Sequence, residues 1–293
     1  MQLAQAPLRE FSRDRIALGA LVLLGAIIAV AAGAPLLSPQ DPYNLAQLDI
    51  LDSKLAPGAK SMDGMTFWLG TDDQGRDMLS AIFHGLRISL GVGIASTLAA
   101  LALGMAIGLM AGYAGGWVDA LIMRIVDLQL SFPSILIALV LLAVLGQGVD
   151  KIVIALVAVQ WAYYARTVRG SALVEKRKEY VDAARCMAYG TGRILFRHIL
   201  PNCLPPLIVV ATVQVAHAIA LEATLSFLGL GMPITEPSLG LLIANGFVHL
   251  LSGKYWISFF PGIALLVTIA SFNLVGDRMR DVLNPRLAAH YAA

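Results

Sequence analysis

Residues 179–202 read EYVDAARCMAYGTGRILFRHILPN, a polar and basic segment that lies between long apolar runs. Of the 293 residues, 58% are hydrophobic and only 14% are charged, and the mean hydropathy is +0.76. A soluble domain of this size cannot bury so much apolar surface. The composition therefore predicts a membrane protein, and the charged loop in its middle is the first candidate for a contact with another protein.

Six apolar runs are long enough to cross a bilayer, which takes about 20 residues in a helix. They lie at 16–37, 88–112, 121–146, 150–168, 204–231 and 258–276. None shows the alternation of a barrel strand, and an open sheet edge cannot be satisfied in lipid. We predict an all-α integral membrane protein with six transmembrane helices.

The basic residues indicate the orientation of these helices. With the N-terminus inside, most of the 21 Lys and Arg residues fall in segments on the inner side, whereas the first outer loop is rich in aspartate. Because basic residues are retained in the cytoplasm, we predict that both termini are cytoplasmic. The first run is longer than the apolar core of a signal peptide, so we interpret it as an anchor.

Four segments follow from this topology. Residues 1–37 hold a cytoplasmic tail and the first transmembrane helix, and residues 38–87 form an outer loop whose Pro and Gly favour turns over a packed domain. Apolar residues at helical spacing within 77–87 predict an amphipathic helix that lies in the membrane interface. Residues 88–276 carry five spans, and residues 277–293 form a second cytoplasmic tail.

The central loop is predicted to contain two short helices. Small apolar residues on one face predict a helix over 180–189, which the glycines at 190 and 192 end. A second helical piece, 193–200, is predicted to stop at the prolines that follow it, Pro201, Pro205 and Pro206. Short helices with small side chains on one face can bind in a groove of another protein. The alternative interpretation is a solvated basic loop beside anionic lipid headgroups.

Several single residues invite an interpretation. Glu222 lies within an apolar run. Placing a carboxylate inside the membrane costs free energy, so this residue suggests a gate or a substrate contact. We favour a hydrogen bond that holds the fifth transmembrane helix to its neighbours. Arg124 and Asp127 are three residues apart and are predicted to pair on one helix face. Cys186 and Cys203 lack a metal-binding or redox spacing, and we interpret both as packing residues.

The chain shows no sequence signature of an enzyme. The nearest approach to a phosphate-binding loop, residues 252–255, lacks the first glycine and the hydroxyl residue of such a loop. A nucleophile elbow, a HExxH helix and paired catalytic carboxylates are absent from the sequence. His84 and His217 are too far apart in sequence to indicate a metal site. We therefore expect no catalytic residue, cofactor or metal in this chain.

The central loop resembles the cytoplasmic EAA loop of ABC-importer permeases, in which Glu-Ala-Ala is followed by Gly and later by Leu-Pro. Asp182, Ala183 and Ala184 match the triplet, with Asp in place of Glu. Leu200 and Pro201 fall at the family spacing. The resemblance implies that this loop couples the chain to an ATPase.

One position of the loop departs further from the family. Ala188 stands where Gly is usual, and Gly190 can supply the flexible point instead. The implied coupling loop spans 169–203. Its implied contact residues are Glu179, Tyr180, Asp182, Ala183, Ala184, Ala188, Gly190, Leu200 and Pro201.

The resemblance extends from about residue 14 to residue 287 and narrows to the dipeptide, oligopeptide and nickel importers. It rests on LGTDDQGRDMLS at 69–80, LEATLSFLGLGMP at 221–233 and FPGIALLVTIASFNLVGDRMRDVLNPR at 260–286. These stretches are similar to the C-type permease subunit, which implies an N-terminal anchor and a five-helix type I permease core over 88–276. Leu239 departs from the family, in which many members have Trp.

The resemblance implies a multi-pass permease subunit of an ATP-driven importer in the bacterial inner membrane, with a periplasmic outer loop. The implied cargo is a di- or oligopeptide, and the alternative is nickel or another small solute. The implied partners are a second, different permease, one or two P-loop ATPases that bind ATP and Mg, an external substrate-binding protein and the lipid bilayer, but no nucleic acid. An ion-driven secondary transporter is a remote alternative. Such a transporter would show inverted repeats and matched intramembrane acids, whereas this sequence shows no internal repeat and its acids Glu222 and Asp127 lie in unmatched contexts.

Overall fold

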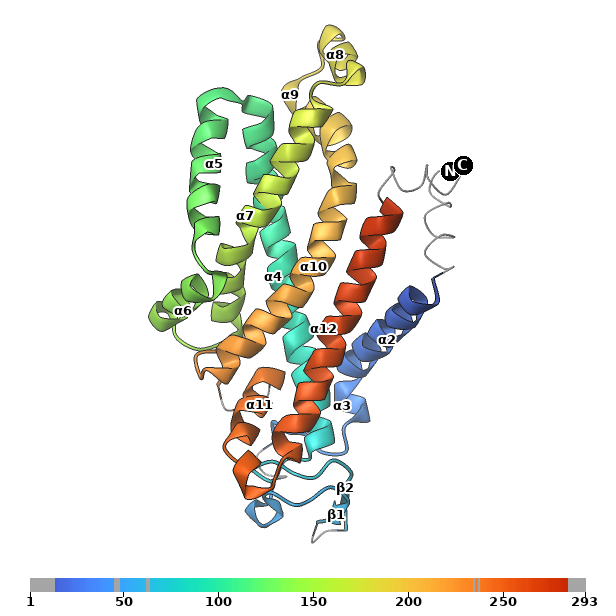
Figure 1. Cartoon of the computed structure of the whole chain (residues 1–293), viewed down its shortest axis with the longest axis vertical. Helices are drawn as coiled ribbons and strands as arrows, with labels where there is room; N and C mark the ends of the chain where they lie inside the picture. The colour runs from blue at the N-terminus through green and yellow to red at the C-terminus, as the bar shows by residue number, and fades with distance from the viewer. Residues whose placement is uncertain (1–13, 45–47, 62–63, 234, 237, 284–293) are drawn as a thin grey trace.

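The computed structural model describes residues 14–44, 48–61, 64–233, 235–236 and 238–283. Most of the first predicted tail and of the second, at 1–13 and 284–293, lies outside the described residues. The described chain is mostly helical and elongated, with one small hairpin at one end (Figure 1).

The long helices run back and forth along this axis (Figure 1). The helices are α2 (Arg15–Ala32), α3 (Ala34–Leu37), α4 (Met78–Ala114), α5 (Gly116–Ser131), α6 (Ser134–Leu145), α7 (Val149–Glu175), α8 (Glu179–Cys186), α9 (Thr191–Arg193), a π-helical segment (Ile194–Ile199), α10 (Leu200–Phe227), α11 (Leu239–Phe247) and α12 (Trp256–Leu283). Short 3₁₀ turns lie at Ile50–Asp52 and Leu250–Ser252, and the strands are β1 (Ala59–Lys60) and β2 (Thr66–Phe67).

Four helical stretches of the described chain are long and apolar enough to span a membrane. They are α2, α4, the continuous stretch Thr191–Phe227 and α12, and the α5–α6 pair makes a fifth span if it is counted as one. The prediction of a helical membrane protein is confirmed. On length and composition the number of spans is four or five, against six predicted, because α7 is long enough but too polar to count among them.

α4, α7, α10 and α12 form the body of the molecule (Figure 1). α2 packs against α4 and α12 on one side, and α5 with α6 lies on the other. α8 stands at one end of the long axis, and α11 with the hairpin lies at the opposite end. The start of α2 is joined to the last turns of α12 by an ion pair between Asp14 and Arg278 at 3.7 Å.

The third predicted span, 121–146, is not one straight helix. α5 and α6 meet at an angle of 91°. Phe132 between them is extended, with φ −93° and ψ 144°, because the ring of Pro133 disfavours the helical conformation of the residue before it. The sequence pattern of apolar residues continues through this bend and did not reveal it.

Glycines let α4 and α7 pack with their backbones in contact. A Cβ atom on Gly104 would lie 2.3 Å from the carbonyl oxygen of Trp161, and one on Gly108 would lie 2.3 Å from that of Ala165. Only the absence of a side chain allows helices to approach so closely. Gly104 and Gly108 therefore serve helix packing.

The outer segment 38–77 is here called the outer cap, and its described residues, 38–44, 48–61 and 64–77, form a packed structure and not an open loop. Thr71 is buried, and its hydroxyl accepts a hydrogen bond from the Leu55 amide at 2.7 Å. The indole of Trp256 donates to the Thr71 carbonyl at 3.2 Å and so ties the cap to the start of α12. The prediction of turns without packing was wrong because hydrogen bonds to the backbone, which composition does not reveal, hold these turns together.

The predicted interfacial helix within 77–87 is also corrected. These residues are the first turns of α4, which Asp77 caps by accepting from the Ser80 amide at 2.9 Å. Met78, Ile82 and Leu86 are buried in a cluster with residues of α2 and α12. The same apolar stripe that would face lipid headgroups is covered here by neighbouring helices.

Candidate functional site

The predicted coupling loop places a short helix, α8, at the far end of the molecule (Figure 1). Glu179 and Asp182 lie in its first turn and Arg185 in its last, where each charge is favourable to the helix dipole. Val181 and Ala184 are buried in a cluster with the π-helical segment and α7. The predicted first helix is therefore present, although it ends at Cys186 and not at residue 189.

The two alanines of the family triplet have different environments. Ala184 is 3% exposed and packs inward, whereas Ala183 is exposed. Met187, which follows the helix, is 60% exposed, and Cys186 is exposed as well. The exposed side of α8 and of the residue after it thus combines Ala183, Cys186 and Met187 with the charged residues Glu179, Asp182 and Arg185. The prediction that Cys186 is a packing residue is wrong for the described chain, while Cys203 is buried.

Ala188 explains why glycine is usual at its position in the family. Its φ is +54°, in the left-handed region that favours glycine, and its amide donates to the Arg185 carbonyl at 2.9 Å. Gly190 has an ordinary φ of −62°. The left-handed turn thus lies at Ala188 and not at Gly190, and the expectation that Gly190 supplies the flexible point stays a prediction.

The second part of the loop is one continuous helix from Thr191 to Phe227. The prolines at 201, 205 and 206, which were predicted to stop a short helix, lie in the first turns of α10. A membrane helix tolerates proline when local π or 3₁₀ turns and neighbouring groups satisfy the freed carbonyls. The π-helical segment Ile194–Ile199 directly precedes these prolines.

A group of hydrogen bonds joins α8 to the helices on either side of the loop. The Tyr180 hydroxyl donates to Glu175 Oε2 at 2.6 Å, and Lys178 pairs with Glu175 Oε1 at 2.6 Å. Asn202 Nδ2 donates to the Tyr180 hydroxyl at 3.1 Å and to the His198 carbonyl at 2.8 Å. Burial and the nearby Glu175 carboxylate raise the pKa of Tyr180 to about 12, so its hydroxyl stays protonated at physiological pH.

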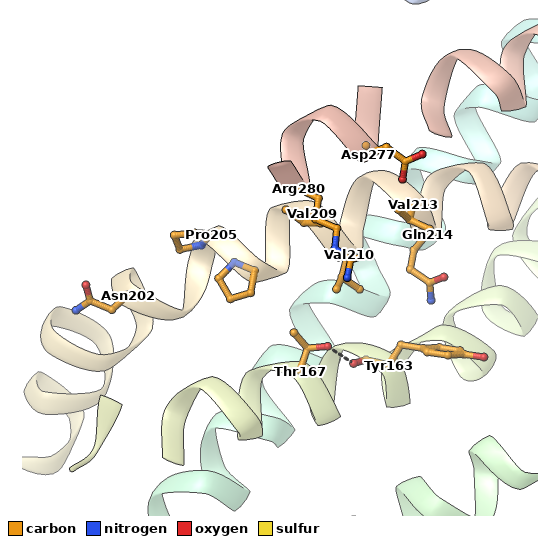
Figure 2. A pocket seen from close by; sticks show the side chains of 12 residues that line it. Tyr163, Thr167, Asn202, Pro205, Val209, Val210, Val213, Gln214, Asp277 and Arg280 are labelled. Atoms are coloured by element: carbon orange, nitrogen blue, oxygen red, sulfur yellow. Dashed lines mark hydrogen bonds between the residues drawn. The ribbon is translucent and has the colours of Figure 1, made fainter. Parts of the chain in front are cut away.

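A groove of about 850 Å³ lies between α7, α10 and α12 (Figure 2). Its polar lining includes Tyr163, Thr167, Asn202, Gln214, Asp277 and Arg280. The Gln214 side chain is buried, and its Nε2 has no hydrogen-bond partner within the described chain. Such a lining is costly against lipid, so the groove suits contact with water, solute or another protein.

Glu222 lies outside the lining of this groove. It is fully buried, and its carboxylate accepts hydrogen bonds from Ser89 on α4 at 2.9 Å and from Ser226 at 2.7 Å. α11 packs on the same part of α10, where a Cβ atom on Gly240 would lie 2.3 Å from the Ala223 carbonyl oxygen. The geometry places Glu222 in a junction between helices.

The predicted pair of Arg124 with Asp127 is corrected. Asp127 instead pairs with Arg166 of α7, and Asp119 forms a two-pronged pair with Arg169 at 2.9 and 2.6 Å. Spacing along one helix could not reveal these pairs, because their partners lie on a second helix. Both pairs join α5 to α7.

Comparison with known proteins decides the family. The model of the binding-protein-dependent transport system inner membrane component matches residues 104–289, and the model of the N-terminal transmembrane domain of oligopeptide transport permease C matches residues 2–57. The chain belongs to the family of binding-protein-dependent transport permeases. The family predicted from the loop and the other motifs is confirmed, and the chain is a permease subunit of an ABC transporter.

Relatives match this permease over nearly its whole length. A di/tripeptide transport system permease protein of Pseudomonas aeruginosa is 37% identical over 287 residues, which cover 96% of this chain and 93% of the relative. A glutathione transport system permease protein of Pectobacterium atrosepticum is 38% identical over 279 residues, which cover 95% and 90%. An inward-facing structure of the MetNI methionine ABC transporter shares the fold, with a TM-score of 0.54 and 20% identity over 70% of this chain and 97% of the other.

The junction at Glu222 gives a first prediction for this permease. Replacing Glu222 with leucine removes the acceptor of two buried hydroxyls, and we expect the variant to lose stability by about 1–3 kcal/mol per hydroxyl left unpaired. Glu222→Gln keeps one acceptor oxygen and is expected to be milder and to retain uptake per folded molecule. The midpoint of thermal unfolding in detergent and the uptake rate would be measured together. A Gln variant that folds normally but does not transport would instead make Glu222 a gate.

Proposed function

We propose that the chain is one half of the translocation pathway of an ATP-driven importer for di- or oligopeptides. The observation that carries the proposal is α8, a helix with exposed small and apolar residues that is hydrogen-bonded to a helix of the polar groove. Such a helix can bind in a groove of a cytoplasmic ATPase. The names of the relatives, which refer to di/tripeptides and glutathione, support a peptide-like cargo.

We place six transmembrane helices in this chain, an anchor at α2 and a five-helix core in which α7 is the additional span. At 1.5 Å per residue, the 27 residues of α7 extend about 40 Å, enough to cross a bilayer. Its low hydropathy has a physical reason, since Gln160 and Tyr164 are buried against other helices and not exposed to lipid. The proposed organisation keeps the four segments 1–37, 38–87, 88–276 and 277–293, with the first turns of α4 at the end of the second.

The proposed orientation places α8 and both termini in the cytoplasm and the outer cap in the periplasm of a bacterial inner membrane. The α8 end carries a high density of basic residues, which are retained in the cytoplasm. The start of α2 and the end of α12 lie toward that end of the long axis (Figure 1). An external substrate-binding protein would then dock on the outer cap and deliver the cargo.

The proposed partners supply what this chain does not carry. One or two P-loop ATPase subunits would bind ATP and Mg and bind α8 through residues 179–188, while a second, different permease would complete the groove. ATP binding would pull on α8, and the helix bundle would swing between inward and outward openings. The chemistry would occur in the ATPases and not in this chain, and no nucleic acid takes part.

Reconstitution tests this proposal. The tagged chain would be purified from its native membrane in mild detergent, the co-purified proteins identified by mass spectrometry, and the complex placed in vesicles with the binding protein and a labelled dipeptide. We expect a second permease and P-loop ATPases in the complex, and uptake that needs ATP and survives collapse of the proton gradient. Uptake by the chain alone that stops with the gradient would favour the ion-driven alternative, and uptake of nickel in place of the dipeptide would favour the other cargo.

A further inference from the structure

Asn202 belongs both to the loop and to the groove. Its side-chain amide donates to the Tyr180 hydroxyl of α8 at 3.1 Å, and the same residue lines the groove between α7, α10 and α12. It stands at the end of α10 nearest to the loop (Figure 2). A single side chain therefore connects α8 to the wall of the groove.

Tyr180 is held from the other side by α7. Its hydroxyl donates to Glu175 Oε2 at 2.6 Å, and Glu175 is the last residue of α7. Hydrogen bonds to a charged group are stronger than those between neutral groups. The hydroxyl of Tyr180 thus joins three elements, α7, α8 and α10, at one point.

The backbone between α8 and the groove is weaker than an ordinary helix. Between α8 and Asn202, residues 194–199 are wound as a π-helix, and Pro201 supplies no N–H to the helical ladder. Such features are where helices bend. A displacement of α8 carried only by this backbone would be absorbed partly by bending, so a side-chain connection that bypasses it has a mechanical role.

The apolar contacts of α8 join it to the π-helical segment. Val181 and Ala184 are buried together with Ile194 and Ile199, so the helix is packed against the π-helical segment and cannot move independently of it. His198 in that segment also stacks on the Tyr189 ring, with centroids 6.0 Å apart. These contacts, with a hydrogen bond from the Tyr180 hydroxyl to the His198 carbonyl at 3.3 Å, hold α8 to the π-helical segment, whereas the Tyr180–Asn202 hydrogen bond reaches beyond it.

We propose that Tyr180 and Asn202 are positioning residues that deliver the movement of α8 to the cytoplasmic mouth of the groove. This inference rests on the proposed function, since it assumes that an ATPase moves α8. Glu175 anchors the Tyr180 hydroxyl to α7, and Asn202 transfers its displacement to α10.

The test compares uptake per ATP hydrolysed in the reconstituted complex. Tyr180→Phe removes only the hydroxyl, and Asn202→Ala removes its partner. The matched control is Tyr189→Phe, because the Tyr189 hydroxyl bonds to none of the described residues while its ring also contacts His198. We expect complexes of both test variants to keep the ATPases bound and to hydrolyse ATP. The amount of dipeptide transported per ATP should fall at least about threefold relative to the control, as the loss of a hydrogen bond of this strength implies.

Two further variants sharpen the result. The double variant should lose no more coupling than the Tyr180 variant alone, because each single variant already removes the Tyr180–Asn202 hydrogen bond. Glu175→Gln keeps an acceptor for the Tyr180 hydroxyl and is expected to retain most of the coupling, whereas Glu175→Leu is not. A ratio of uptake to ATP that equals the control in both single variants would overturn the inference. Loss of the ATPases with an unchanged ratio in the remaining complexes would also overturn it, because the two residues would then shape only the docking surface.

Failure of the proposed function would be visible separately. It would appear in the unmodified complex, as uptake that does not depend on ATP or as a preparation without an ATPase. Failure of the inference would appear only in the variants, in a complex whose unmodified form transports at the expense of ATP.

Discussion

Substitution of Ala183 by glutamate is expected to reduce ATP-driven uptake about tenfold or more while the permease still folds, because an unpaired charge buried in an interface costs several kcal/mol. Ala183 is exposed on α8, so the change disturbs little within the chain itself. Thermal unfolding of the purified permease, the amount of ATPase that co-purifies with it and peptide uptake would be measured on the same preparation.

The choice of residue decides whether this experiment is informative. Ala184 is 3% exposed in a packed cluster, and a glutamate there would act on folding before it acted on docking. Ala183→Ser is the matched control, since it adds a small polar group at the same exposed position and is expected to transport normally. Normal uptake by the Glu variant, with the ATPase bound, would place the docking surface elsewhere on the loop.

Substitution of Gly108 by valine is expected to prevent the permease from folding. A Cβ atom there would lie 2.3 Å from the carbonyl oxygen and 2.8 Å from the Cα atom of Ala165, so the backbone of α7 would have to move away from α4. Overpacking of this kind costs about 3 kcal/mol or more when the atoms in the way belong to a rigid helix. The yield of monodisperse protein in detergent and its thermal midpoint would show the loss.

Gly91 provides the control on the same helix. It is exposed, and a Cβ atom on it would meet nothing within 4 Å, so Gly91→Val should fold with nearly the yield of the unmodified chain. Equal yields for the two valine variants would show that α4 and α7 are not held by backbone contact at Gly108. Valine is a better helix former than glycine, so helix preference adds no cost to either variant.

The sequence predicted the features that depend on composition and local spacing. The apolar runs located α2, α4, α10 and α12, and the resemblance of the loop led to the family that the comparisons confirm. These features are read from a residue and its near neighbours in the chain. A long apolar helix needs no tertiary information to be recognised.

The features that were missed depend on distant contacts. The outer cap is held by bonds such as that between Trp256 and Thr71, 185 residues apart, and Asp127 found its partner on another helix and not on its own. The prolines of α10 were interpreted as a stop because their cost to a helix is local, while the groups that compensate for it are not. The coupling residues at 179–201 and the role of Glu222 remain predictions.

The contact of the first helix with the last has a consequence for biosynthesis. Residues of α2 and α12 share one buried cluster with the start of α4, and the cap is tied to the first residue of α12. A ribosome delivers the N-terminal segments first. The face of α2 that ends against α12 therefore stays covered by lipid until the final helix enters the membrane. Until then the cap is held to the start of α4, where the Gln40 amide donates to the Ser80 hydroxyl, but not to α12. A chain truncated before Trp256 thus lacks a helix and, with it, one of the attachments of its outer cap.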